Sequence, residues 1–381
     1  MIYLDNSATT RVLPEAADAA RAAMTEQFYN PASAYGPAVE TERMVERARK
    51  HVAEAMSRAP EEIVFTSGGT ESNNMAVFGT LRDIRGKRRV ITCKSEHASV
   101  YETVRSFEDS ADTQVVFIGC NPDGTASLAQ LEAALTPDTA LVSLMHVNNE
   151  TGAVNDLAGA YALIRRLCPG ALLHVDGVQA FCKLPFTRIP CDLYNVSAHK
   201  FHAPKGVGAL FVRSGVRFSG GQIGGGQERS LRSGTTNVPG ILGMEAALMQ
   251  YRAHQTEWMR QMRACKERLA ANLLTIPDAV VNGPSVSDGA GHILNVSFPG
   301  VRGEVLLNAL SERGVCVSTG SACSAHRKGV NRVLSAIGVT GARQEGALRF
   351  SFCPFNTLEE MDLAASAVEE QVEFLRRYKR R

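Results

Sequence analysis

The sequence predicts an α/β protein with a mostly parallel sheet in a large domain, followed by a smaller α+β domain. From about residue 60, short apolar runs alternate with amphipathic helical stretches, as in sheets covered by helices on both faces. Beyond about residue 240 the pattern changes to longer helices and fewer strands. The 381 residues also exceed the ~250–300 residues at which a single core stops growing. We expect a large domain over 15–250 and a small domain formed by 1–14 and 251–381.

The individual elements follow from the spacing of apolar residues. Buried strands are predicted where nearly continuous apolar runs occur, at 63–65, 90–91, 115–118, 141–144, 172–175 and 209–212. Amphipathic helices are predicted between some of them, at 127–135 and 156–167. In the second domain we expect helices over 240–273, 304–312 and from 358 onward, and strands at 293–298 and 348–352.

Charge and cysteine content exclude several classes of function. The 41 basic and 39 acidic residues give a net charge of +2, which provides no electrostatic argument for direct nucleic-acid or lipid partners. No apolar run reaches the ~18 residues of a membrane span, and the N-terminus has no signal-peptide pattern. The nine cysteines are scattered without a CxxC pair, which disfavours a disulfide framework or a metal site. We therefore expect a cytoplasmic protein without a bound metal.

A glycine-containing motif follows the first predicted strand of the large domain. It reads Ser67-Gly68-Gly69-Thr70 and opens a helical stretch. Glycines let the backbone approach an anion, and the free amides of a helix N-terminus then point toward it. A simple Ser or Thr helix cap is the alternative. Because a cap does not need two adjacent glycines, we favour an anion site that includes Gly69 and Thr70.

Two charged residues end apolar runs further along the chain. Asp176 stands at the carboxyl end of a buried strand, the edge where ligands bind in open α/β sheets. It could pair with a protonated cofactor ring or cap the next helix. Lys200 ends another apolar run, where a partly desolvated amine can form a Schiff base. Lys205 is the competing lysine, but Pro204 and Gly206 beside it predict an exposed turn.

With further motifs in the same order, the chain resembles the cysteine desulfurases of the class V aminotransferase family. These motifs lie at 3–10, 30–33, 96–97, 145–150, 232–235 and 318–323, and the resemblance extends from residue 2 to about 370. It implies an aspartate aminotransferase-like fold of type I, with a seven-stranded sheet. It also implies pyridoxal 5'-phosphate as the cofactor.

The resemblance further implies a role for each matching residue around the cofactor. Lys200 would hold the cofactor covalently, Asp176 would pair with its pyridinium nitrogen, and Gln179 would hydrogen-bond its phenolic oxygen. His97 would stack on the ring and help to move protons, with Asn149 beside it. The residues that would hold the phosphate are Gly69, Thr70, Ser197, His199 and, from a second subunit of a homodimer, Thr235.

Substrate binding and sulfur transfer are implied in the same way. Arg349 would bind the carboxylate of L-cysteine, as its forked guanidinium suits, and Asn30 would assist. Cys323 would take the sulfur as a persulfide, leaving L-alanine, and would pass it to an acceptor protein. Taken alone, His97 would be interpreted as a core histidine and Arg349 as half of an ion pair.

The acceptor and two alternative functions stay open. Iron–sulfur cluster assembly and thiolation of tRNA or cofactors both use such a sulfur donor, through a scaffold or a sulfur-relay protein. A selenocysteine lyase, or another class V lyase, would have the same cofactor site. A catalytically silent binding subunit is disfavoured because Lys200, Asp176 and His97 are all present.

The chain departs from the family pattern next to Cys323. His326, Arg327 and Lys328 are basic where housekeeping desulfurases carry an acidic residue and a proline. The chain also ends soon after its last predicted helix, without the tail that many iron–sulfur assembly desulfurases use to dock a scaffold. The basic run is either a solvated face or a docking surface for an acidic acceptor.

Overall fold

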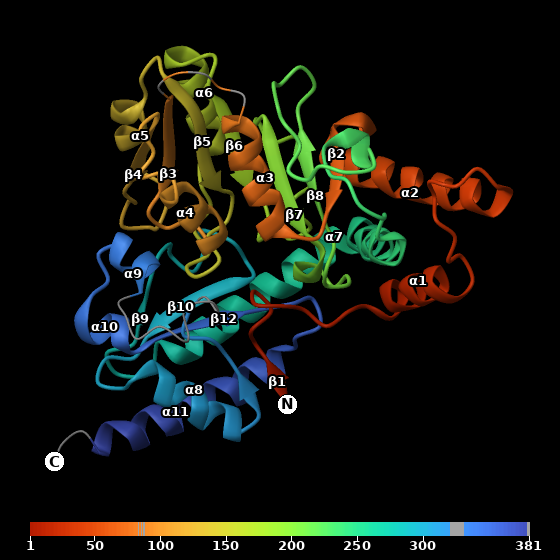
Figure 1. Ribbon diagram of the computed structural model, residues 1–381. Helices are drawn as coiled ribbons and strands as arrows, with labels where there is room; N and C mark the ends of the chain where they lie inside the picture. Colours follow the sequence, from red (N-terminus) through yellow and green to blue (C-terminus); the bar gives the residue numbers. More distant parts are fainter. Residues whose placement is uncertain (83, 85, 87, 321–330, 379–381) are drawn as a thin grey trace.

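The large sheet has seven strands, which confirms the predicted fold class. The structure, a computed structural model, describes residues 1–82, 84, 86, 88–320 and 331–378. The strand order is β2-β8-β7-β6-β5-β3-β4 (Figure 1). All neighbours pair in parallel except β8, which runs antiparallel to β7 and β2. The strands are β2 (Ile63–Thr66), β3 (Arg88–Cys93), β4 (Thr113–Ile118), β5 (Thr139–Met145), β6 (Leu172–Asp176), β7 (Leu193–Ser197) and β8 (Gly208–Val212).

Helices cover both faces of this sheet, which explains why its strands are apolar at consecutive positions. Alternate strand residues point to opposite faces. Val64 and Val90 pack toward α3 (Gly69–Leu81) and α4 (Ala98–Arg105), whereas Ile63 and Ile91 belong to the core on the other side. This core, called the first core below, is covered by α1 (Pro14–Thr25), α2 (Gly36–Ala55), α5 (Leu128–Ala134), α6 (Leu157–Leu167) and the first part of α7 (Val238–Leu273).

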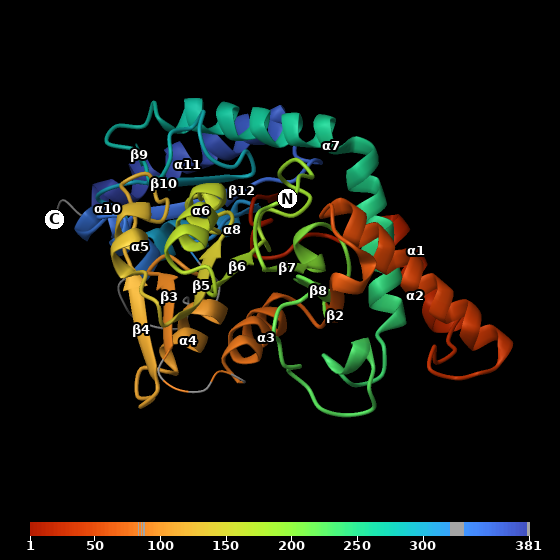
Figure 2. The same cartoon turned by 90° about the horizontal axis from the view of Figure 1, so that it is seen from above.

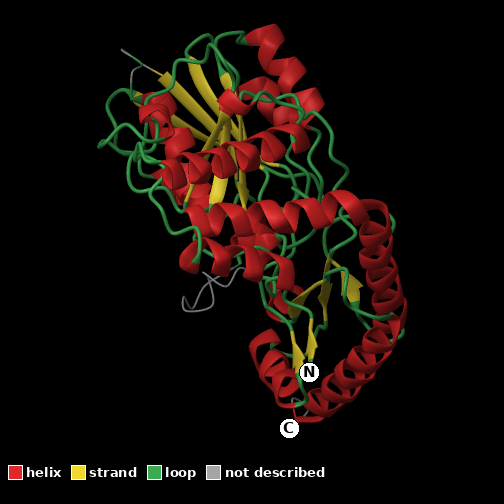
Figure 3. Ribbon diagram, turned by 90° about the vertical axis from the view of Figure 1, so that its right-hand side faces the viewer, coloured by secondary structure: helices red, strands yellow, loops and turns green. Residues whose placement is uncertain are grey.

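The rest of the chain forms a smaller group of strands and helices (Figure 3), most of which pack around a second hydrophobic core. Its antiparallel sheet has the order β12-β10-β9, and β1 pairs in parallel with β11. These strands are β1 (Ile2–Tyr3), β9 (Val280–Val281), β10 (Ile293–Ser297), β11 (Val315–Cys316) and β12 (Ala347–Ser351). The accompanying helices are α8 (Gly303–Glu312), α9 (Arg332–Ala336), α10 (Gly341–Glu345) and α11 (Leu358–Tyr378).

Helix α7 contributes to both cores. Its 36 residues supply Tyr251 to the first core and Met262 to the second, and Figure 2 shows it extending across both parts of the molecule. The predicted boundary at residue 250 falls inside this helix and stays a prediction. Among the described residues, no helix is long and apolar enough to cross a membrane.

Candidate active site

A cavity of about 260 Å³ lies at the carboxyl ends of β5, β6 and β7. The structure brings ten predicted site residues together in its lining: Gly69, Thr70, His97, Asn149, Asp176, Gln179, Ser197, His199, Lys200 and Arg349. Seven further residues complete the lining: Ser7, Ala8, Asn73, Ser99, Met145, Val147 and Val178. The parallel strands explain this convergence, because their carboxyl ends meet at one edge of the sheet.

Lys200 enters the cavity from the short 3₁₀ turn Ala198–Lys200 that follows β7. Its Nζ donates hydrogen bonds to the carbonyl oxygens of Ser7 at 2.6 Å and Ala8 at 2.8 Å. The N-terminal segment therefore lies against the amine. Lys205 does not line this cavity but a neighbouring hollow of about 340 Å³, which shares Gly69 and Thr70 with it.

Asp176, the last residue of β6, is buried, and each of its carboxylate oxygens accepts one hydrogen bond. Its Oδ2 accepts from Asn73 Nδ2 at 2.8 Å, and its Oδ1 accepts from the Val178 backbone amide at 3.0 Å. Asn73 Nδ2 also donates to Ser99 Oγ at 2.8 Å. Asn73 was not among the predicted site residues, although it lies on the helix that the Gly68-Gly69 motif opens. These bonds hold the carboxylate in one orientation.

His97 caps the N-terminus of α4 and keeps its imidazole neutral. Its Nδ1 accepts from the Ser99 amide at 3.2 Å and lies 2.7 Å from Ser99 Oγ. Burial lowers the pKa of His97, and the nearby Asp176 carboxylate only partly opposes this effect. Because Nδ1 accepts a backbone hydrogen bond, the neutral ring carries its proton on Nε2.

Gln179 is fixed by contacts on both ends of its amide. Its Nε2 donates to the Ser7 carbonyl at 2.9 Å, and its Oε1 accepts from Lys183 Nζ at 3.1 Å. Lys183 is itself buried, and burial lowers its pKa to about 7, with the neighbouring charge of Lys200 as a further cause. Lys183 was not among the predicted site residues, because its flanking residues Cys182 and Leu184 give no polar signal.

The glycine motif places the N-terminus of α3 against the cavity. Gly68 has a φ of 145°, which disfavours a side chain, and a Cβ added to Gly69 would lie 2.8 Å from Val178 Cγ2. His199 Nδ1 lies 3.2 Å from Thr9 Oγ1, and burial lowers the pKa of His199 to about 3. This end of the cavity therefore offers helix amides and neutral polar groups.

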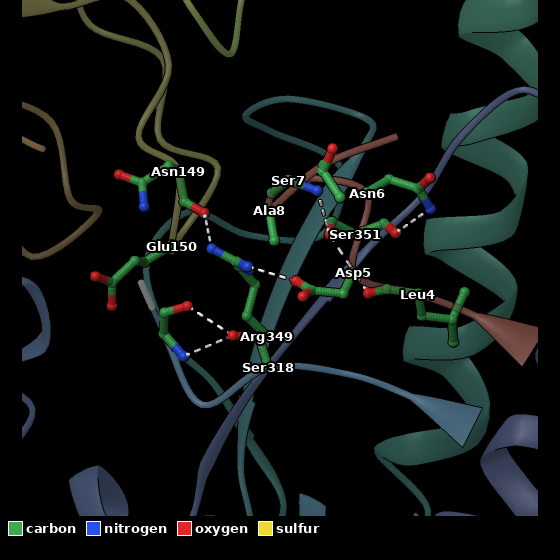
Figure 4. Close-up of polar contacts among 12 residues, drawn as sticks. Leu4, Asp5, Asn6, Ser7, Ala8, Asn149, Glu150, Ser318, Arg349 and Ser351 are labelled. Atoms are coloured by element: carbon green, nitrogen blue, oxygen red, sulfur yellow. Dashed lines mark hydrogen bonds and ion pairs between the residues drawn. The ribbon is translucent and has the colours of Figure 1, made fainter. Parts of the chain in front are cut away.

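Arg349 on β12 is buried, with 1% of its surface exposed, and its guanidinium points toward Asp5 and Asn149 (Figure 4). Its Nη2 donates to Asp5 Oδ1 at 2.6 Å, and its Nη1 donates to the Asn149 carbonyl at 3.0 Å. Its backbone pairs with Ser318, which fixes the strand beneath the guanidinium. A buried cation beside the cavity suits an anionic substrate group.

Two predicted residues lie outside the cavity, and one lies outside the described residues. Asn30 is exposed between α1 and α2, where its Oδ1 accepts from the Ala32 amide at 3.0 Å. Thr235 is exposed just before α7. Neither residue lines the cavity of its own subunit. Cys323 and the basic residues 326–328 lie outside the described residues.

The described residues on either side of that interval meet at Glu150. Asn331 Nδ2 donates to Glu150 Oε2 at 2.7 Å. A Cβ added to Gly320 would lie 3.0 Å from the same oxygen. Glu150 follows Asn149, so residues 320 and 331 both lie next to the loop that lines the cavity. Across the described residues, no cluster of three His, Cys, Asp or Glu side chains could hold a metal ion.

Comparisons with known proteins agree with this geometry. The aminotransferase class-V family model matches residues 2–363. A cysteine desulfurase from Trichormus azollae is 39% identical over 379 residues, covering 99% of this chain and 94% of that protein. A solved NifS-like protein superposes with a TM-score of 0.91 at 36% identity, covering 98% of this chain and 99% of that one. A structure of SspA in complex with cysteine gives a TM-score of 0.81 at 29% identity, covering 94% and 100% of the two chains. The chain belongs to the class-V aminotransferase family, among its cysteine desulfurases.

Proposed function

We propose that this cysteine desulfurase holds pyridoxal 5'-phosphate in the cavity and passes the sulfur of L-cysteine to Cys323. The observation that carries the proposal is the convergence of Lys200, Asp176 and Arg349 on one cavity at the strand ends. An amine, a carboxylate and a guanidinium in these positions suit an aldehyde, a protonated ring nitrogen and a substrate carboxylate. The SspA relative, solved with cysteine, supports the choice of substrate.

The residues of the cavity fit this cofactor. Three buried oxygen atoms of the lining residues have no hydrogen-bond partner among the residues that the structure describes, namely Ser7 Oγ, Asn73 Oδ1 and Asn149 Oδ1. Buried polar atoms are normally paired, so they indicate a polar ligand. Lys200 would hold the aldehyde, Asp176 the ring nitrogen, and the start of α3 the phosphate. When bound, the cofactor stabilises negative charge that develops at the substrate's α-carbon.

The chain's own residues orient the substrate and hold its protons. Arg349 can bind the cysteine carboxylate with the guanidinium that now contacts Asp5. His97, neutral with its proton on Nε2, can donate to a group in the cavity while Ser99 holds its Nδ1. The Cys323 thiolate would attack the substrate sulfur, so that an S–S bond forms as the C–S bond breaks.

Replacing each of the two candidate lysines tests the cofactor site. We expect Lys200→Ala to abolish the visible absorbance of bound cofactor and the formation of alanine and sulfide. Lys205→Ala should keep the absorbance, because Lys205 lies in the neighbouring hollow rather than in the cavity. Absorbance retained in the first variant and lost in the second would reverse the assignment. Parallel assays with cysteine and selenocysteine distinguish a desulfurase from a selenocysteine lyase.

A second variant tests the route of the sulfur. Cys323→Ser should keep the visible absorbance and bind cysteine, yet form no alanine or sulfide. Cys316 and Cys353 are the competing thiols; neither lines the cavity, and burial raises the pKa of Cys353. Turnover equal to that of the parent would assign the sulfur to one of them.

The sulfur acceptor is proposed to be a scaffold or relay protein with an acidic surface. The basic residues Arg327 and Lys328 near Cys323 support this charge complementarity. Neutralising both should slow transfer to such an acceptor at low salt, without changing alanine formation with a small thiol. The described cysteines are free thiols, which fits a reducing compartment such as the cytoplasm.

A further inference from the structure

Two free cysteines face each other at the ends of neighbouring strands of the large sheet. Cys93 is the last residue of β3, and Cys120 follows the end of the neighbouring strand β4. Their sulfur atoms lie 3.4 Å apart. Because a disulfide bond is about 2.05 Å long, the two sulfurs need to approach by only about 1.4 Å to form one.

The two thiols differ in exposure and acidity. Cys93 is buried, whereas Cys120 is partly exposed. The hydrogen bond between them lowers the pKa of Cys120 to about 7, and the same bond raises the pKa of Cys93. Since the thiolate is the reactive form, Cys120 is suited to react first with an oxidant and Cys93 to follow.

Only three residues, Lys94 to Glu96, separate Cys93 from His97, and their contacts tie them to the active site. The guanidinium of Arg332 donates to the carbonyl oxygens of Lys94 and Glu96. Asn148 Nδ2 donates to the Ser95 carbonyl at 3.1 Å, and the Ser95 hydroxyl lies 3.2 Å from Cys93 Sγ. A movement of Cys93 would therefore reach the residues that place His97.

We propose that Cys93 and Cys120 form a disulfide on exposure to peroxide, and that this modification slows the chemistry in which His97 takes part. The Cys120 thiolate attacks one peroxide oxygen and the O–O bond breaks. Hydroxide departs, and Cys120 becomes a sulfenic acid. Cys93 sulfur then attacks that sulfur, the S–O bond breaks, and the hydroxide takes the Cys93 proton as water. The two thiols lose two electrons, and peroxide is reduced to water.

The disulfide can be detected directly in the holoenzyme. The Cys323→Ser background prevents oxidation of the catalytic thiol. After peroxide treatment and alkylation, mass spectrometry should show the Cys93 and Cys120 peptides linked, and a dithiol should release them. The link should be lost in Cys120→Ser and in Cys93→Ala. It should remain in Cys168→Ser, because the Cys168 thiol lies elsewhere and donates to the Thr136 carbonyl.

The functional effect is measured on the same protein. Addition of cysteine should change the cofactor absorbance roughly tenfold more slowly after oxidation, since small misplacements of a catalytic group are costly. A dithiol should restore the rate, and Cys120→Ser should show no such slowing. Oxidation of Cys120 without a link to Cys93 would overturn the disulfide site. A complete link with an unchanged rate would overturn its coupling to His97.

Discussion

At the scale of single residues, Lys183 illustrates how a buried cation can fix the orientation of a neighbour. Its amine donates to Gln179 Oε1, so the Gln179 amide must present Nε2 on its other side, where it reaches the Ser7 carbonyl. Burial of the amine disfavours its charged form, which is why its pKa falls to about 7. Burial of the Lys183 amine therefore lowers the folding stability by an amount that depends on pH.

Replacing Lys183 by Met removes this pH-dependent contribution to stability, so that it can be measured by comparison with the parent. In the folded protein the pKa of Lys183 is about 7, against 10.5 for a free lysine. Between these values the unfolded chain keeps a proton that the folded chain has released, so folding stability from this group rises with pH. The free energy of unfolding of the parent, relative to Lys183→Met, should therefore rise by up to ~1.4 kcal/mol per pH unit. Urea unfolding of both holoenzymes across this range measures it, and parallel pH profiles would contradict it.

A second residue-scale prediction concerns the substrate carboxylate. Arg349→Lys removes the fork that contacts both Asp5 and the Asn149 carbonyl. Losing part of a buried charge pair costs ~2 kcal/mol or more, so kcat/KM for cysteine should fall by about 30-fold or more. Arg313→Lys is the matched control, because Arg313 forms an exposed pair with Glu370. A similar fall in kcat/KM in both variants would contradict the assignment of Arg349 to the substrate carboxylate.

The sequence predicted most of the cavity through motifs, and its failures have a common cause. Asp176 and Lys200 stand where apolar strands end, so a local pattern singled them out, whereas the role of His97 was predicted only through the resemblance to the family. Ser7 contributes its backbone carbonyl, which accepts from Lys200, and Lys183 contributes a buried amine, which donates to Gln179. No local sequence pattern indicates either contact. The partner of Arg349 is Asp5, at the opposite end of the chain.

At the scale of elements, the strength of the local apolar pattern decided what the sequence could predict. The six predicted strands of the large sheet and the long helix after residue 240 were confirmed, because several apolar residues define each period. β9, β11, α9 and α10 were missed; these elements have between two and five residues. The longer helices α1, α2 and α4 were missed as well, and many of the buried positions of α1 and α2 are alanines, which give a weak apolar pattern. β11 exists because it pairs with β1, so its stability comes from a distant strand.

The start of α3 gives a prediction at this scale. Gly68→Ala forces a side chain onto a backbone with a φ of 145°, which costs on the order of 1 kcal/mol or more and tilts the amides that we assign to the phosphate. The dissociation constant of the cofactor should therefore rise by about fivefold or more, as measured by absorbance titration. Gly36→Ala, at the start of α2 with open space around it, should leave the affinity unchanged. Equal affinities in both variants would show that α3 does not hold the phosphate.

At the scale of the whole molecule, two predicted site residues point to a second subunit. Asn30 and Thr235 are both exposed, and neither lines the cavity of its own chain. Isologous dimers are the commonest assembly, and one could place both residues at the partner's cavity. The resemblance of the 232–235 motif implied this role for Thr235, whereas the exposed position of Asn30 was not expected from the sequence. The homodimer therefore remains a prediction.

Hybrid dimers test whether Thr235 completes the active site of the partner subunit. A Lys200→Ala subunit lacks the amine, and a Thr235→Ala subunit lacks the hydroxyl offered to its partner. If Thr235 acts across the interface, a hybrid of the two has one complete site and should show about half of the parent activity per dimer. Each variant alone should be less active than the hybrid. A fully active monomer in sedimentation, or a hybrid no better than its components, would contradict the shared site.

The 36-residue helix α7 has a consequence for how the protein melts. At about 1.5 Å per residue it is ~54 Å long, and its two halves supply buried side chains to two different cores. If one core lost its packing, the half of α7 that it buries would become exposed, while the other half would still be held by the other core. The two cores are therefore coupled through α7. Heating should therefore produce one calorimetric transition rather than two. A single proteolytic cut near Trp258, between the two halves, should separate the melting of one core from that of the other.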